Sequence, residues 1–191
     1  MSRRRVAILI SGAGSNMAAL IRAMQAPGHP ARPVLVFSND PAAPGLSSAR
    51  GLGVPTAAAD HRRYPDRASF DAEVQRALEA ARADLVACAG YMRIMTDGLV
   101  EAWRGRMLNV HPSLLPLFKG LHTHARALET GVAIHGCTVH EVVPELDAGR
   151  ILGQAAVPVL PGDTEDTLAA RVLRQEHRLY PAALAALARG A

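Results

Sequence analysis

Short apolar runs alternate with amphipathic segments over the first half of the chain, and this alternation limits the fold more than any other feature. The apolar runs have the length of buried strands, and they cover Arg5–Ser11, Val34–Ser38, Val54–Ala57 and Leu85–Ala89. The segments between them carry helical patterns, and they cover Met17–Gln25, a short stretch toward Arg50, and Arg67–Arg82. The alternation predicts a parallel sheet with helices on both faces.

The pattern changes after a further apolar stretch at Met107–Val110. Two long predicted strands, Ile134–Val143 and Ile151–Val159, follow with only a short loop between them. Strands so close in sequence favour antiparallel pairing over a crossover connection. An amphipathic helix then runs from near Asp163 toward Ala188. We therefore expect an α/β fold of two lobes with a cleft between them, in which antiparallel C-terminal strands complete the sheet.

The charge of the chain is mildly positive, with a formal net charge of +4 and a sequence pI of about 9.7. The basic residues are nearly all arginines, scattered along the chain, and Lys119 is the only lysine. Nucleic-acid binding usually requires a clustered basic surface. We therefore expect no nucleic-acid partner, and a small anionic substrate explains the positive excess equally well.

The cysteines and the N-terminal residues indicate in which cellular compartment the protein is expected. Cys88 and Cys137 lie in apolar runs and form neither a disulfide framework nor a metal pattern, which fits a reducing cytosol. The apolar run after Arg3–Arg5 is shorter than the roughly 7–15 residues of a signal-peptide core. No stretch approaches the ~20 apolar residues of a membrane span. We expect a cytoplasmic protein of 191 residues that has no membrane partner and forms one domain.

A glycine-containing turn lies between the first predicted strand and the first predicted helix. Such a turn, followed by unpaired N–H groups at a helix start, can bind an anion. A dinucleotide site would need a third glycine where Met17 stands, and no Gly-Lys-Ser/Thr sequence indicates a triphosphate loop. A monophosphate site is therefore predicted, with a plain tight turn as the alternative. Its residues are Gly12, Ala13, Gly14, Ser15 and Asn16.

A second polar cluster follows the strand predicted at Met107–Val110. Asn109 and His111 are two positions apart, so they share one face of a strand. The prolines of the following Pro112-Ser113-Leu114-Leu115-Pro116 end the strand in a stiff loop. An amide donor beside an imidazole can stabilise a developing oxyanion and move a proton. Taken singly, a histidine after a strand is usually structural, and the downstream Asp147-Ala148-Gly149 reads as a turn.

The run Asn109–Pro116, followed by the distant Asp147, resembles the signature of the formyl-folate transferase superfamily. The likeness extends from about Arg5 to Leu187. The resemblance implies a mixed, roughly seven-stranded sheet with a Rossmann-like N-terminal half of parallel strands. It also implies a single formyltransferase domain over residues 1–191. In that domain, about 1–100 would bind phosphate and about 101–191 would bind folate and carry the catalytic residues.

The resemblance also implies a reaction. Family members transfer the formyl group of 10-formyltetrahydrofolate, a co-substrate, to an amine. Asn109 would stabilise the oxyanion, His111 would act as general acid, and Asp147 would orient and charge His111. The Gly12–Asn16 turn would hold a ribose phosphate, although many relatives have Asn where Ala13 stands.

Within the superfamily, the chain most resembles the branch that formylates glycinamide ribonucleotide in de novo purine synthesis. The tRNA-directed branch carries an additional C-terminal domain, and the formyl-folate hydrolases carry an additional N-terminal one. This chain starts directly with a predicted strand and ends soon after Leu187, which favours the purine branch.

Other binding residues are assigned by the same resemblance. Arg67 matches an arginine at the glutamate end of folate, and Glu176 matches a glutamate that contacts the glycinamide substrate. From position alone, both read as solvated helix charges. The folate pocket would be lined by Asn109 together with Met92, Arg93, Ile94 and Met95, although methionines in an apolar run are usually core residues.

The remaining histidines carry weaker signals. His122 and His124 have no carboxylate or cysteine at ligand spacing, so we expect no metal and interpret Gly120–His124 as a loop bordering the cleft. Alternation places His135 and His140 on opposite faces of a strand, with His140 able to face the site.

Two other classes of function stay open. A carrier or sensor could bind folate or a sugar phosphate without turnover. A dinucleotide reductase could use Asp40 for the ribose, although the third glycine is missing. The sequence leaves the oligomeric state open.

Overall fold

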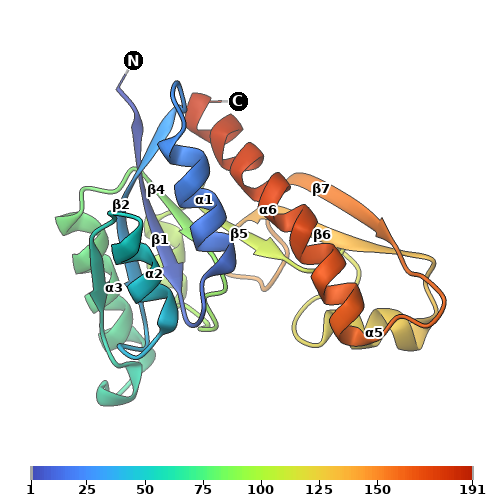
Figure 1. Cartoon of the computed structure of the whole chain (residues 1–191). Coiled ribbons are helices and arrows are strands. Elements are labelled where there is room, and N and C mark those ends of the chain that lie inside the picture. Colours follow the sequence, from blue (N-terminus) through green and yellow to red (C-terminus); the bar gives the residue numbers. More distant parts are fainter. Residues whose placement is uncertain (1, 191) are drawn as a thin grey trace.

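The computed structural model describes residues 2–190 and gathers seven strands into one mixed sheet (Figure 1). The strand order is β3-β2-β1-β4-β5-β6-β7. The strands are β1 (Arg4–Ile10), β2 (Ala31–Ser38), β3 (Thr56–Ala58), β4 (Leu85–Cys88), β5 (Met107–His111), β6 (Ile134–Glu141) and β7 (Ile151–Pro158). The helices are α1 (Ser15–Gln25), α2 (Pro44–Gly51), the short 3₁₀ helix η1 (His61–Arg63), α3 (Arg67–Ala80), α4 (Asp97–Ala102), α5 (Thr123–Thr130) and α6 (Glu165–Arg189).

The direction of the strands changes once across the sheet. β3, β2, β1, β4 and β5 pair in parallel, whereas β5–β6 and β6–β7 pair antiparallel. Each parallel neighbour is reached through a helical crossover, while a short hairpin joins β6 to β7. The predicted mixed sheet, with a Rossmann-like N-terminal half and antiparallel strands completing it, is confirmed.

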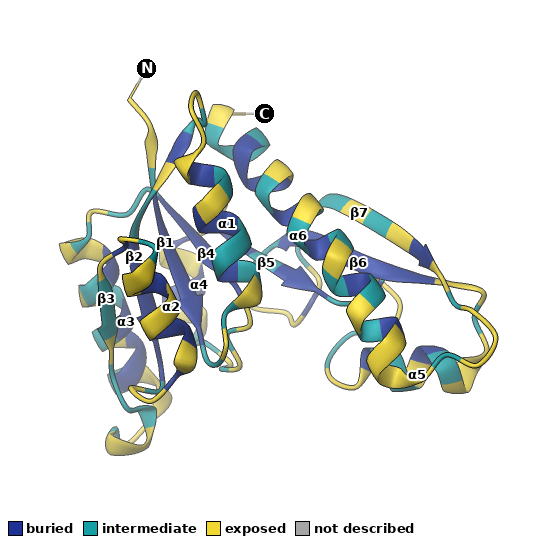
Figure 2. Cartoon of the chain, viewed as in Figure 1, coloured by how far each residue is buried: buried dark blue, intermediate teal, exposed yellow. Residues whose placement is uncertain are grey.

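Two separate apolar cores lie on the two faces of the sheet. One core is formed with α1, α2 and α6 and includes Met17, Leu46 and Leu184. The other is formed with α3 and α4 and includes Phe70 and Leu99. In Figure 2 the strands β1, β4 and β5 are buried between these helices. Burial on both faces explains why these strands read as continuous apolar runs in the sequence.

The antiparallel part of the sheet is covered differently. Helix α6 packs on one face, and the segment after β5 covers β6 on the other. A Cβ on Gly136 would lie 2.1 Å from the Ala155 carbonyl oxygen and 2.9 Å from the Leu114 side chain. The Thr138 hydroxyl donates to the Ser113 carbonyl (2.7 Å) and accepts the Leu115 N–H (3.0 Å). Hydrogen bonds therefore attach this segment to the sheet.

Some predicted boundaries were wrong. β2 begins at Ala31 rather than Val34, so the strand includes Pro33. A proline is tolerated at this position, because it lies where the β1–β2 register shifts and outside the part of β2 that pairs with β3. The predicted loop at 120–124 is only partly a loop, since α5 begins at Thr123. It ends at Thr130, and its C-cap Gly131 has a φ of 70°, which favours glycine. Both cysteines are buried and unpaired.

The helices of residues 2–190 include none with the length and apolarity needed to cross a membrane. The same residues contain no group of three or more His, Cys, Asp or Glu side chains arranged to hold a metal ion.

Candidate active site

The predicted polar segments meet along one edge of the sheet. β1, β4 and β5 are parallel neighbours, so their carboxyl ends lie together. The glycine turn follows β1, the segment 90–95 follows β4, and His111 ends β5. This edge is where open α/β sheets bind ligands.

Asp147 lies beside His111, as the resemblance implied. Its Oδ2 atom is 3.4 Å from His111 Nδ1, and both side chains are buried. The same oxygen accepts the Gly120 N–H at 2.9 Å. Asp147 has a φ of 49°, which an aspartate tolerates better than most residues. The other ring nitrogen of His111, Nε2, is 2.9 Å from the Phe118 carbonyl oxygen. Two acceptors therefore hold the imidazole ring in one orientation.

His140 completes the cluster. It pairs with Asn109 across the β5–β6 ladder, and its Nε2 is 3.4 Å from Asn109 Nδ2 and 3.7 Å from Asp147 Oδ1. Burial lowers the pKa of His140 below its usual value, partly offset by the Glu141 carbonyl and by Asp147. The neutral ring can donate from Nδ1 to the Glu141 carbonyl oxygen (2.9 Å) and accept from the Asn109 amide. This arrangement fixes the direction of the Asn109 amide.

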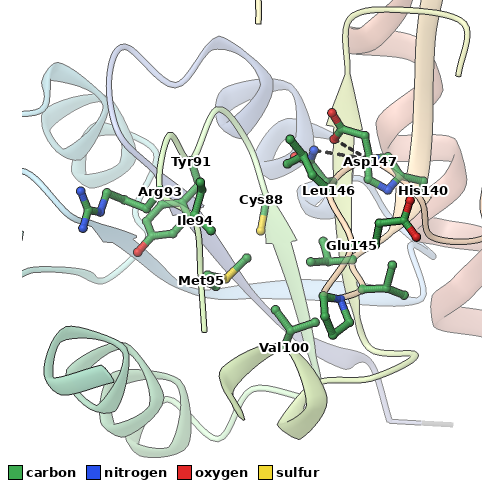
Figure 3. Close-up of a pocket in the computed structure, with 14 residues that line it drawn as sticks. Cys88, Tyr91, Arg93, Ile94, Met95, Val100, His140, Glu145, Leu146 and Asp147 are labelled. Atoms are coloured by element: carbon green, nitrogen blue, oxygen red, sulfur yellow. Dashed lines mark hydrogen bonds and ion pairs between the residues drawn. The ribbon is translucent and has the colours of Figure 1, made fainter. Parts of the chain in front are cut away.

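A cavity of about 150 Å³ opens beside this cluster (Figure 3). Ligand pockets commonly measure about 300–1,000 Å³, so this cavity is suited to one ring system of a larger ligand. It is lined on one side by the segment after β4 and on the other by the hairpin loop 142–147. Its lining residues are Cys88, Tyr91, Arg93, Ile94, Met95, Val100, Asn109, His140, Val142, Val143, Pro144, Glu145, Leu146 and Asp147.

Two of the residues assigned to folate do not line this cavity. Met92 is 67% exposed, and its backbone N–H bonds to the Ser11 hydroxyl. Arg67 is exposed at the start of α3. Arg93, Ile94, Met95 and Asn109 do line it.

The glycine turn has the backbone geometry that its sequence predicted. Gly14 has a φ of 73° and precedes α1, which begins without a side-chain cap. The Gly45 N–H, at the start of α2, donates to the Gly12 carbonyl oxygen (3.1 Å), and a Cβ on Gly45 would lie 2.7 Å from that oxygen. α2 therefore supports the turn through a contact that only glycine allows.

Glu176 is buried, so the expectation of an exposed helix charge from its position alone was wrong. It lies on the face of α6 that packs inward, and Asn16 Nδ2 donates to its Oε2 at 2.6 Å. Burial raises the pKa of Glu176, while Asn16 and nearby His111 act in the opposite direction. Glu176 is thus bonded to the last residue of the glycine turn, and the charge of His111 acts on it.

The other histidine pair lies away from the cavity lining. His135 Nε2 is 3.2 Å from His124 Nδ1, and burial lowers the pKa of His135 to about 4. As predicted from alternation, His135 and His140 lie in different surroundings. The sequence analysis gave His140 too little weight as a site residue, although alternation had indicated that its side chain could face the site.

Comparison with known proteins identifies the family of the chain. Residues 4–184 match the family described as formyl transferase. The chain is 43% identical to the phosphoribosylglycinamide formyltransferase of Escherichia coli (strain K12) over 185 residues, which cover 97% of this chain and 87% of that protein.

Longer relatives and solved structures agree. The chain is 48% identical over 188 residues to the human trifunctional purine biosynthetic protein adenosine-3, covering 98% of this chain. It spans only 19% of that protein and 14% of its Drosophila melanogaster relative. The crystal structure of phosphoribosylglycinamide formyltransferase from Brucella melitensis matches with a TM-score of 0.94 and 52% identity, covering 98% of this chain and 96% of that one. The chain therefore belongs to the formyl transferase family.

Proposed function

We propose that this protein transfers the formyl group of 10-formyltetrahydrofolate to the amine of glycinamide ribonucleotide, a step of de novo purine synthesis. The observation that carries the proposal is the contact of Asn109, His140, Asp147 and His111 at the same sheet edge as the glycine turn. Relatives named for this activity cover nearly the whole chain.

The ribonucleotide phosphate binds at the turn Gly12–Asn16. Its backbone N–H groups and the start of α1 supply donors and a partial positive charge. Because these donors belong to the backbone, Ala13 serves as well as the Asn of many relatives. Glu176, held by Asn16 of the turn, contacts the glycinamide part. These assignments place phosphate binding in about residues 1–100.

The folate ring occupies the cavity between the segment after β4 and the loop 142–147. Arg93, Ile94 and Met95 line it together with Asn109. Met92 and Arg67, both exposed, contact the part of folate outside the cavity, with Arg67 near the glutamate carboxylates. Folate binding and catalysis thereby fall to about residues 101–191, together with the 92–95 segment.

The chemistry is direct transfer. The unprotonated amine attacks the formyl carbon, a new C–N bond forms, and the bond to folate N10 breaks. The Asn109 amide, oriented by His140, donates to the oxygen that gains charge. His111 gives a proton to N10, the proton that the attacking amine loses returns to His111, and Asp147 stabilises the doubly protonated ring. Each of these groups contributes roughly 10²–10³ in rate.

The test combines purified protein with glycinamide ribonucleotide and 10-formyltetrahydrofolate, without added metal, and follows formylated ribonucleotide and tetrahydrofolate. Formation of both products, dependent on both substrates, is the expected result. Folate consumption without formylated ribonucleotide would indicate a hydrolase or another acceptor. Folate binding without turnover would favour a carrier or sensor, and binding of a nicotinamide dinucleotide would favour the reductase. Trapping a stoichiometric formyl-enzyme would contradict direct transfer.

A further inference from the structure

A chain of hydrogen bonds runs behind both proposed substrate sites, through residues that follow β1 and β2. Ser11 directly follows β1, Asn39 follows β2, and His61 opens η1. Ser11 Oγ is 2.5 Å from Asn39 Oδ1, and Asn39 Nδ2 is 3.1 Å from His61 Nδ1. The reaction described above uses none of these three side chains.

Ser11 joins the two sites directly. Its hydroxyl accepts the Met92 N–H at 2.8 Å, and its own N–H donates to the Gly90 carbonyl oxygen at 3.0 Å. The next residue, Gly12, begins the glycine turn. Ser11 is therefore bonded to the segment that leads into the folate cavity and is covalently part of the strand that ends in the phosphate turn.

Two of these hydrogen bonds run in one direction. The Met92 N–H donates to the Ser11 hydroxyl, and the Ser11 hydroxyl donates to Asn39 Oδ1. Hydrogen bonds ordered in this way strengthen one another. His61 Nδ1 lies 3.1 Å from Asn39 Nδ2 and 3.0 Å from the Asn39 carbonyl oxygen, so it accepts from the amide in one tautomer and donates to the carbonyl in the other.

The surroundings make each link costly to lose. Asn39 is 5% exposed, so removing its partner leaves a buried polar group unsatisfied. The His61 ring packs edge-on against Phe70, with ring centroids 6.2 Å apart. The series of hydrogen bonds thus ends at His61, which is held by packing on the α3 side of the sheet.

We propose that Ser11 and Asn39 are positioning residues that hold the phosphate turn and the 90–95 segment in one relative arrangement. A ligand that orders the turn then orders the segment as well, so each substrate tightens the binding of the other. Such coupling is reciprocal by thermodynamic necessity. The identity of the two ligands rests on the proposed function.

The test measures coupling without turnover. The Kd of tetrahydrofolate is determined by calorimetry, alone and with saturating glycinamide ribonucleotide, a pair that cannot react. In the unmodified protein the ribonucleotide is expected to lower this Kd at least about fivefold. In Ser11→Ala the ratio of the two Kd values falls to near one, and both KM values rise more than kcat falls. Ser11→Thr, which keeps the hydroxyl, restores the ratio.

The controls separate positioning from general stability. Ser47→Ala removes an exposed hydroxyl from α2 and should change neither the ratio nor the thermal midpoint. Asn39→Asp keeps the acceptor for Ser11 but removes the amide N–H group that faces His61 Nδ1, and it should weaken the coupling only in part. A ratio near one in the unmodified protein, or an unchanged ratio in a folded Ser11→Ala variant, overturns the proposal.

Turnover by the unmodified protein, measured alongside, distinguishes this inference from the proposed function. Turnover with a ratio near one overturns the coupling and leaves the function standing. Absence of both turnover and binding overturns both.

Discussion

The two ends of the candidate active site are built from different parts of the chain. The phosphate turn is local: its donors are backbone groups of consecutive residues, set by Gly14 and supported by Gly45. The catalytic cluster is assembled from β5, β6 and the loop after β6, and it acts through side chains. A backbone site tolerates side-chain changes that keep its dihedral angles, whereas a side-chain site tolerates almost none.

The largest expected effect comes from His111→Ala. Loss of a positioned acid should lower kcat by about 10²–10³, while ribonucleotide affinity stays near normal because the turn is untouched. Steady-state kinetics and calorimetry measure the two quantities. Equal losses in both would mean that His111 is structural and that the two ends are not independent. His29→Ala, on a histidine in the loop between α1 and β2, is the control.

Asp147→Asn should follow, with a loss of activity greater than tenfold. The amide can still accept the Gly120 N–H through its oxygen, so the loop should keep its position. It cannot stabilise a charged imidazole as a carboxylate does. Activity and thermal unfolding are measured together. Full activity in a folded variant would remove Asp147 from the mechanism.

Gly14→Ala tests the other end of the site. An alanine at a φ of 73° costs about 1–2 kcal/mol, so KM for the ribonucleotide should rise about five- to thirtyfold with kcat nearly kept. The nearest atom to the new Cβ, Met17 Cε at 2.7 Å, ends a flexible side chain and can move. Gly28→Ala is the matched control, since its φ is 75° and no other atom lies within 4 Å. It should lower stability without raising KM.

The smallest expected effect is that of Glu176→Gln, and it is a change in the stability of the fold. Burial raises the pKa of Glu176 in the folded state, so the folded protein keeps this proton to higher pH than the unfolded chain does. The resulting stabilisation is present below the ordinary glutamate pKa and is lost as pH rises through the raised value. The glutamine variant, which has no charge to bury, should therefore gain about 1 kcal/mol over the parent near neutral pH.

The check is the thermal midpoint of both proteins from acid to neutral pH. The difference between them should grow as pH rises. A difference independent of pH would mean that the buried carboxyl does not titrate between the folded and unfolded states.

Several site features were predictable because they depend on near neighbours. The shared face of Asn109 and His111 follows from strand alternation, and the turn at Gly12–Asn16 follows from its glycines and the helix after it. Glu176 was not predictable from position, because its burial depends on how α6 packs against α1 and the sheet. His140 was underestimated for a similar reason, since only the β5–β6 register brings it to Asn109.

The sequence by itself determined the order of strands and helices, the glycine turn and the Asn–His pair, because backbone preferences and side-chain periodicity act over a few residues. Only the tertiary structure decided which distant groups meet. Asp147 reaches His111 because the hairpin loop folds back over the end of β5, and Asn16 reaches Glu176 because α1 and α6 share one core. Those contacts depend on how whole elements pack, which no local stretch of sequence specifies.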